Sequence, residues 1–114
     1  MIILIAGFVV LTACAPAWAQ ITLFTGRQEI SDEWDFCVQT KQAIHDVEML
    51  FFEFERPAAW TLSIDGSEVR TFTGKSYDTY KGSLKAGTHL IKIAVQKPAT
   101  LLMMRGSNGV ELCP

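Results

Sequence analysis

Two histidines are the residues best suited to acid–base chemistry in this chain, and neither lies in a catalytic pattern. His45 precedes Asp46 in the segment AIHDV, and His89 lies within a β-rich run. A serine or cysteine nucleophile needs a base beside it and a third group that holds the base. The chain contains no Gly-x-Ser-x-Gly turn, and its serines fall in strand or turn contexts. We therefore predict that the protein is not an enzyme.

Carboxylates do not form a catalytic or metal-binding pattern either. Glu53 and Glu55 alternate with apolar residues, which is typical of the solvated face of a strand rather than of a glycosidase pair. Asp65 lacks the further spaced carboxylates of a calcium loop. The histidines and cysteines have no zinc-site spacing. We predict no metal and no cofactor.

Two tyrosines in a polar segment are the best candidates for ligand binding. Tyr77 and Tyr80 lie in GKSYDTYKG, next to Lys75 and Asp78. Tyrosine has an apolar ring and a polar hydroxyl, a combination that suits a recognition surface for sugar or protein. In an extended segment these two rings would point to opposite sides. The hypothesis of a shared site therefore requires an irregular loop with both rings exposed.

Three cysteines occur in the chain: Cys14, Cys37 and Cys113. Cys14 lies in the N-terminal segment and would be removed or lipidated on export. Cys37 and Cys113 then remain as an even pair, for which a disulfide is expected in an oxidising compartment.

Residues 1–19 contain no charged side chain and are predicted to be an export signal. An apolar stretch from Ile2 to Leu11 is followed by Pro16 and then by Ala-Trp-Ala, with small residues at the positions that a signal peptidase inspects. We expect cleavage after Ala19, which would release a periplasmic or secreted protein.

Two alternatives for this segment stay open. The run Leu-Thr-Ala-Cys, which ends at Cys14, resembles a bacterial lipobox, and lipidation there would give a membrane-anchored lipoprotein. If the segment is not cleaved, the stretch from Ile2 to Ala19 is just long enough to span a bilayer core. In either case the membrane would be contacted only through residues 1–19.

The charge balance argues against nucleic acid as a partner. Ten Lys and Arg residues face twelve Asp and Glu residues, for a net charge of −2. Phosphate neutralisation by Lys and Arg supplies most of the affinity for nucleic acid. An envelope protein or a glycan remains the expected partner.

From residue 46 onward the sequence alternates as β-strands do. Leu50, Phe52 and Phe54 fall on one face, with the glutamates on the other, and this period of two indicates a strand with one buried face. Similar short β-rich runs follow up to the C-terminus, separated by Gly, Pro and Asn.

A β-hairpin over residues 60–73 is the clearest local signal. Trp60, Leu62 and Ile64 alternate with small polar residues. The Asp-Gly pair that follows suits a two-residue turn, which requires positive φ. We expect Ile64 and Ser67 to flank this turn, with the three apolar side chains facing the core.

Residues 31–45 have two interpretations. Ser-Asp-Glu at the start is typical of a helix N-terminus. Trp34, Phe36 and Val38 instead alternate with other residues, and the residue types favour a strand. We prefer the strand.

Short strands at this spacing predict an all-β fold. We expect a small antiparallel β-sandwich of about seven or eight strands, of jelly-roll or immunoglobulin-like character. Residues 20–114 should form this single domain, preceded by the apolar export segment.

The sequence resembles two groups of exported proteins. The C-terminal half, with IDG at a hairpin and then LKAGTHLIKIAV, is similar to small extracellular sandwich modules, including carbohydrate-binding ones. The combination of export signal, all-β body and long-range disulfide is similar to small periplasmic lysozyme inhibitors. The Ser-Gly-x-x-Tyr-like segment of those inhibitors is absent from this sequence, and the most similar segment is Gly-Lys-Ser-Tyr at residues 74–77. These similarities define no family.

The expected function is that of an exported, non-enzymatic binding module. It would act at the cell envelope or outside the cell, on a glycan or a protein. A membrane-attached structural or assembly subunit of an envelope complex is the first alternative, and a periplasmic inhibitor-like protein is the second.

Overall fold

The computed structural model describes residues 20–55 and 58–114, and every regular element in these ranges is a β-strand. The predicted export segment, with Cys14, lies outside the described residues. No helix in the described ranges is long and apolar enough to cross a membrane. The strands are β1 (Gln20–Ile30), β2 (Glu33–Thr40), β3 (Ile44–Glu55), β4 (Trp60–Ile64), β5 (Ser67–Phe72), β6 (Tyr77–Leu84), β7 (Gly87–Val95), β8 (Ala99–Ser107) and β9 (Glu111–Leu112).

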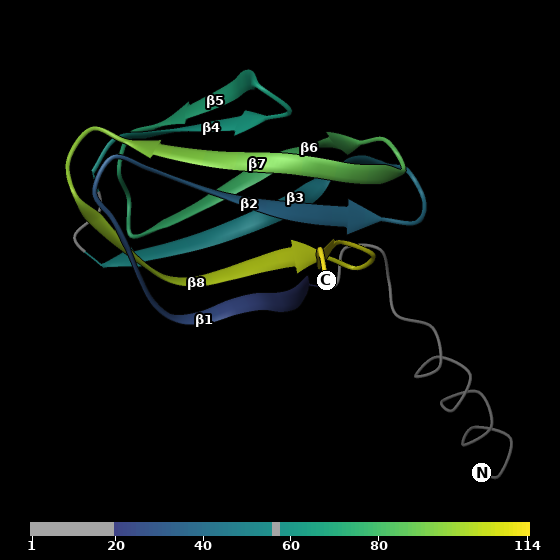
Figure 1. Ribbon diagram of the computed structural model, residues 1–114, viewed down its shortest axis with the longest axis horizontal. Coiled ribbons are helices and arrows are strands. Elements are labelled where there is room, and N and C mark those ends of the chain that lie inside the picture. Colours follow the sequence, from purple (N-terminus) through teal and green to yellow (C-terminus); the bar gives the residue numbers. More distant parts are fainter. Residues whose placement is uncertain (1–19, 56–57) are drawn as a thin grey trace, which may run out of the picture.

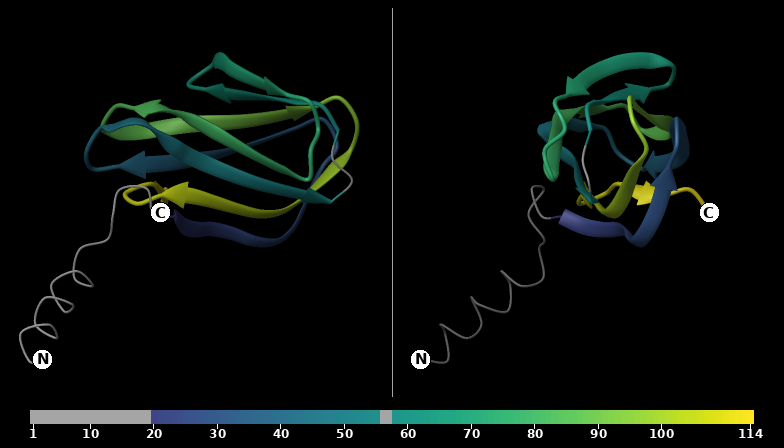
Figure 2. Two further views of the ribbon diagram at one scale, coloured as in Figure 1. Left: turned by 180° about the vertical axis from the view of Figure 1, so that it is seen from behind. Right: turned by 90° about the vertical axis from the view of Figure 1, so that its left-hand side faces the viewer.

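The strands form two antiparallel sheets that face each other as a sandwich (Figures 1 and 2). One sheet has the order β1-β8-β3-β6, and the other has the order β5-β4-β7-β2-β9. The long strands alternate between the two sheets except at the β4–β5 hairpin, which is a jelly-roll arrangement. The predicted all-β sandwich is confirmed, although the described residues contain nine strands rather than seven or eight.

The core lies between the two sheets and is built from alternating residues of their inner faces. On β3, Leu50 and Phe52 are fully buried and Phe54 is 3% exposed. On β7, Ile91 and Ile93 are fully buried. The period-two pattern in the sequence therefore marks the faces that lose contact with water on folding, which is the main favourable term for a sandwich of this size.

An aromatic cluster around Trp60 fills one part of this core. The Trp60 ring stacks on Phe72 with 4.2 Å between ring centroids and an interplanar angle of 20°. It also meets Phe52 edge-on at 5.0 Å and Phe54 at 5.2 Å. These rings come from β3, β4 and β5, so the cluster joins the two sheets.

The predicted hairpin is confirmed, both in the register of its strands and in the side chains that it directs to the core. Ile64 lies opposite Ser67, and the turn residues Asp65 and Gly66 have φ values of 53° and 86°. Positive φ at both positions matches the twist of the flanking strands. Trp60 and Leu62 are buried, as expected for the core side.

The segment after Ser31 forms a strand, as predicted, and not the alternative helix. β2 pairs along its whole length with β7, and Val38 is fully buried. At its end, β2 also pairs with the short β9.

The predicted disulfide between Cys37 and Cys113 is present. Their Cα atoms lie 5.3 Å apart, within the range that a disulfide spans, although the residues are separated by 76 positions. The Cys113 amide also donates a hydrogen bond to the Cys37 carbonyl at 3.0 Å. Cys113 is therefore held to β2 by a disulfide and by a backbone hydrogen bond.

Candidate functional site

The structure does not bring the two candidate tyrosines together. The segment is the strand β6, not an irregular loop, so Tyr77 and Tyr80 point to opposite faces. The Tyr77 side chain is 58% exposed. Tyr80 is half-buried and packs against the core. The condition of a shared irregular loop is therefore not met, and only Tyr77 remains at the surface.

Lys75 and Asp78 do not converge on Tyr77 either. Lys75 is exposed and precedes the strand. Asp78 has the same parity as Tyr80, and its carboxylate accepts a hydrogen bond from the Trp60 indole N–H at 3.4 Å. Burial raises the pKa of Asp78, although the hydrogen bond from Trp60 acts in the opposite direction. Asp78 thus satisfies a buried donor of the aromatic cluster.

Tyr77 belongs to the outer face of the four-stranded sheet. On this face, directly opposed residues of neighbouring strands form three rows across the sheet. Because paired residues in an antiparallel sheet share a face, the register identifies the members of each row. From β1 toward β6, the rows are Thr22, Arg105, Phe51 and Thr79; Thr25, Met103, Glu53 and Tyr77; and Glu29, Thr100 and Glu55.

An aromatic pair lies at the β6 side of this face. The rings of Phe51 and Tyr77 are 5.8 Å apart between centroids, with an interplanar angle of 37°. On the other side of Phe51, the guanidinium carbon of Arg105 lies 5.8 Å from the ring centroid. Phe51 is thus flanked by an exposed ring and an exposed cation. We call these three residues the aromatic platform.

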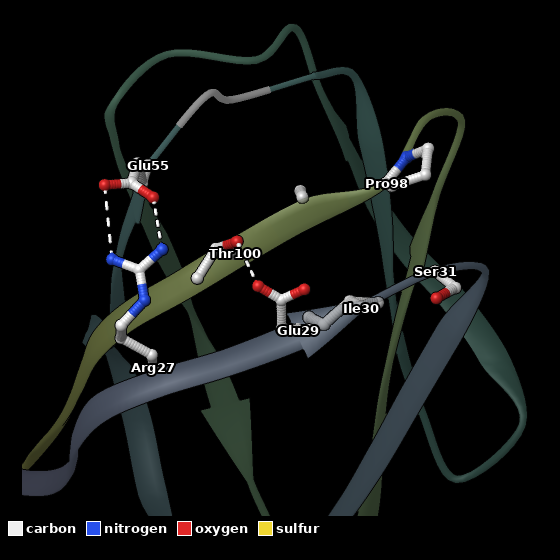
Figure 3. Close-up of a pocket in the computed structure, with 8 residues that line it drawn as sticks. Arg27, Glu29, Ile30, Ser31, Glu55, Pro98 and Thr100 are labelled. Carbon is white, nitrogen blue, oxygen red and sulfur yellow. Dashed lines mark hydrogen bonds and ion pairs between the residues drawn. The ribbon is translucent and has the colours of Figure 1, made fainter.

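A small polar pocket lies on the same face near the end of β3 (Figure 3). Its volume is about 170 Å³. The Arg27 guanidinium donates to both carboxylate oxygens of Glu55, at 2.6 and 3.3 Å, and these hydrogen bonds together with the Glu55 charge raise the pKa of Arg27. The Thr100 hydroxyl donates to Glu29 at 3.5 Å. We call this the carboxylate pocket.

The aromatic platform and the carboxylate pocket lie a fixed distance apart on the sheet. Four residues separate Phe51 from Glu55 along β3, which corresponds to about 13 Å. Three strand spacings separate β6 from β1, or roughly 14 Å across the sheet. Both features project from strands rather than from loops, so their relative position is set by the sheet itself.

A larger groove lies at the opposite end of the sandwich, between the β2–β3 and β8–β9 connections. Its volume is about 660 Å³, and its lining includes Lys41, Ile44, His45, Asn108 and Glu111. Its lining combines polar and apolar residues, but none of them is Phe, Tyr or Trp. We therefore treat it as the competing location for a ligand.

His45 lines the groove at the end of the sandwich, and His89 lies in neither that groove nor the carboxylate pocket. In the described part of the chain, no three His, Cys, Asp or Glu side chains gather as metal ligands would. His89 is 12% exposed in its side chain. Its Nδ1–H donates to Asp65 at 2.6 Å and its Nε2–H to the Lys85 carbonyl at 2.7 Å. A carboxylate and a carbonyl both accept hydrogen bonds, so this geometry favours the doubly protonated form of the ring.

The His89–Asp65 contact shifts the pKa of both groups. The hydrogen bond with Asp65, and then that with the Lys85 carbonyl, raises the pKa of His89. The hydrogen bond from His89, and then that from the Leu90 amide at 2.9 Å, lowers the pKa of Asp65. The contact ties the tip of the β4–β5 hairpin to β7, far from the aromatic platform.

This pair should make the protein most stable in mildly acidic solution. A raised pKa means that the His89 contribution is fully present below the unfolded value of 6.5 and is lost as pH rises through the folded value. A lowered pKa means that the Asp65 contribution is present above the unfolded value of 3.8 and is lost as pH falls through the folded value. We expect the free energy of unfolding, measured with urea, to decrease on the alkaline side.

His89→Gln should remove most of that alkaline decrease. The same substitution at His45, an exposed residue, is the matched control and should leave the decrease in place. A wild-type unfolding free energy that is flat from about pH 5 to about pH 9 would contradict the assignment.

The fold and its surface together define the class of structure to which the chain belongs, a two-sheet antiparallel β-sandwich. No protein-family model matches the sequence, and no curated protein matches it. Among solved structures, the chain is similar to a family 35 carbohydrate-binding module from an environmental isolate. The two are 16% identical, with a TM-score of 0.64, over 82% of this chain and 83% of that one.

A second solved structure with a similar fold is a salicylyl-acyltransferase from a tetracycline biosynthetic pathway. It is 17% identical with a TM-score of 0.50, and the match covers 70% of this chain but only 25% of the acyltransferase. At these identities the similarities establish the fold.

Proposed function

We propose that this protein is a non-enzymatic module that binds carbohydrate on the outer face of its four-stranded sheet. The observation that carries the proposal is the aromatic platform, an exposed Tyr77 ring beside Phe51 with the Arg105 guanidinium on the other side. An aromatic ring offers a flat apolar surface to the C–H face of a sugar. Charged side chains nearby can form strong, directed hydrogen bonds with hydroxyl groups.

The carboxylate pocket provides the second half of such a site. Glu29 and Glu55 place carboxylates in this pocket. A carboxylate oxygen can accept more than one hydrogen bond, so a sugar hydroxyl can donate to Glu29, or to Glu55 in addition to its bonds from Arg27. Binding sites commonly combine an apolar contact surface with a few placed polar groups that fix orientation. The similarity in fold to a carbohydrate-binding module is consistent with this arrangement.

The contacts of His89 support a role without catalysis. Both of its ring nitrogens are engaged with Asp65 and the Lys85 carbonyl, so in this geometry neither is directed at a serine or cysteine side chain.

We also propose that the protein works outside the cytoplasm, in the periplasm or the extracellular space. The Cys37–Cys113 disulfide supports this location, because such bonds persist in oxidising compartments. Thiol titration of the protein recovered from its native compartment tests the location, and two free thiols at these positions would contradict it.

Tyr77→Ala should weaken carbohydrate binding by about tenfold or more, which corresponds to ~1.4 kcal/mol. The substitution removes the exposed ring from the aromatic platform, and Tyr77→Phe should restore most of the affinity because it keeps the ring. Thermal stability should change little, since exposed substitutions usually alter the free energy of unfolding by less than about 0.5 kcal/mol. Affinity electrophoresis against a panel of soluble polysaccharides, followed by calorimetry, measures both properties.

Two control variants locate the site. Leu90→Ala removes an exposed apolar side chain, 48% exposed, from the outer face of the other sheet and should leave binding unchanged. Lys41→Ala alters the groove at the end of the sandwich. If Lys41→Ala abolishes binding and Tyr77→Ala does not, the ligand lies in that groove. If the wild-type protein binds no polysaccharide of the panel, the proposed function is wrong.

A further inference from the structure

The carboxylate pocket is too small to hold a whole ligand by itself. Its volume of about 170 Å³ compares with roughly 300–1,000 Å³ for pockets that enclose a small molecule. Its lining includes the charged side chains of Arg27, Glu29 and Glu55 (Figure 3). Such a pocket can hold one unit of a longer molecule, whose other units must lie on the surface outside it.

The aromatic platform is the surface on which the other units would lie. It belongs to the same face as the pocket. Phe51 and Arg105 lie in the row farthest from the pocket, about 13 Å from Glu55 along β3, and Tyr77 lies opposite Glu53 in the middle row. A sugar ring on Phe51 cannot also enter the pocket, whereas a chain of several sugars can lie across all three rows.

The described residues leave the outer face of the four-stranded sheet uncovered. In the described ranges, no strand or loop lies over the outer face of the four-stranded sheet (Figures 1 and 2). A site closed at one end would select a chain terminus. An open sheet face instead allows a polymer to continue past both the platform and the pocket.

The charges on the path disfavour an anionic polymer. Among the described residues of the three rows and the pocket, three side chains carry a carboxylate, Glu29, Glu53 and Glu55, and two carry a guanidinium group. One guanidinium, that of Arg27, is already bonded to Glu55. The other, that of Arg105, lies over the Phe51 ring. A polymer with a carboxylate or sulfate on each unit would meet net repulsion, and an uncharged one would not.

We infer that this face binds the interior of an extended, uncharged polysaccharide chain, with sugars on the aromatic platform and in the carboxylate pocket at the same time. The inference rests on the proposed carbohydrate-binding function and specifies the ligand class of that same site. Affinity should therefore depend on chain length, and the two ends of the path should contribute separately to it.

The test is calorimetry with cello- and xylo-oligosaccharides from the monomer to the hexamer, with polygalacturonate as the anionic probe. We expect the affinity for at least one neutral series to rise by about tenfold or more from the monomer to the tetramer and then to level off. Polygalacturonate should not bind at physiological ionic strength.

Glu29→Gln separates the two ends of the path. This variant keeps the shape of the side chain but weakens a hydrogen-bond acceptor in the pocket. It should lower affinity for the tetramer severalfold and leave affinity for the dimer, held on the aromatic platform, unchanged. Asp35→Asn, on an exposed residue of β2 in the other sheet, is the matched control and should change neither.

The possible failures are distinguishable. If a monosaccharide binds as tightly as the tetramer and Tyr77→Ala abolishes that binding, the carbohydrate function stands and the inference of chain-interior binding is overturned. Binding of polygalacturonate equal to that of the neutral oligomers would overturn the inference on charge. Absence of binding to either neutral series would overturn the inference, and the polysaccharide panel then decides the proposed function separately.

Discussion

Removing the Cys37–Cys113 disulfide should lower the free energy of unfolding by about 4–5 kcal/mol. The bond closes a loop between residues 76 positions apart, and chain-entropy arithmetic for a loop of this length gives that value. Domains of this size are stable by about 5–15 kcal/mol in total, so much of the margin depends on one covalent bond. The melting temperature should fall by about 20 °C or more.

The measurement is urea unfolding of the wild-type protein with and without a reductant, beside the double variant Cys37→Ala and Cys113→Ala. The double variant should match the reduced protein, and the reductant should have no effect on it. A reduced protein that loses less than about 1 kcal/mol would contradict the prediction. It would mean that the pairing of β9 with β2 and the backbone bond from Cys113 to Cys37 hold the C-terminus by themselves.

Trp60→Ala should cost about 4 kcal/mol of unfolding free energy, the second largest effect that we expect. Trp60 is 1% exposed and touches Phe52, Phe54 and Phe72, so its truncation leaves a large cavity where the two sheets meet. The half-buried carboxylate of Asp78 would also lose the hydrogen bond that the Trp60 indole N–H donates to it. An unpaired acceptor of this kind adds to the cost of the cavity.

Trp60→Phe and Trp34→Ala are the matched variants for this measurement. Trp60→Phe keeps an aromatic ring in the cluster and should cost less than half as much as Trp60→Ala. Trp34 is only half-buried, beside Phe36 at 5.0 Å and Phe24 at 6.2 Å, so its truncation leaves a smaller cavity. If Trp34→Ala proves as destabilising as Trp60→Ala, the cluster around Trp60 is not the principal contact between the sheets.

The parts of the fold that could be predicted from the sequence are those determined by neighbouring residues. Trp60, Leu62 and Ile64 alternate, and the Asp-Gly pair that follows has the φ preference that a hairpin turn requires. Each of these signals lies within a few positions of the others. The alternation of residues does not indicate β1, because its register shifts twice, between Thr22 and Phe24 and between Thr25 and Gln28, and such irregularities break the period of two.

The candidate site could be predicted only in part, because its residues meet through the order of strands in a sheet. Phe51 shares the face of Glu53 and Glu55, and this parity is visible in the sequence. Nothing in the local pattern shows that β6 lies beside β3, or that β8 places Arg105 over the Phe51 ring. The hypothesis of a shared site for Tyr77 and Tyr80 required an irregular loop, and this segment is instead the strand β6, which directs the two rings to opposite faces.

The position of β1 beside β8 determines when this protein can fold. β1 begins at Gln20, which lies opposite Ser107, near the other end of the chain. Its pairing therefore has a high contact order, and folds dominated by such pairings form slowly because the ends of a long loop must first be brought together. The four-stranded sheet therefore cannot be completed before residue 107 has been synthesised, and until then β1 has no partner strand.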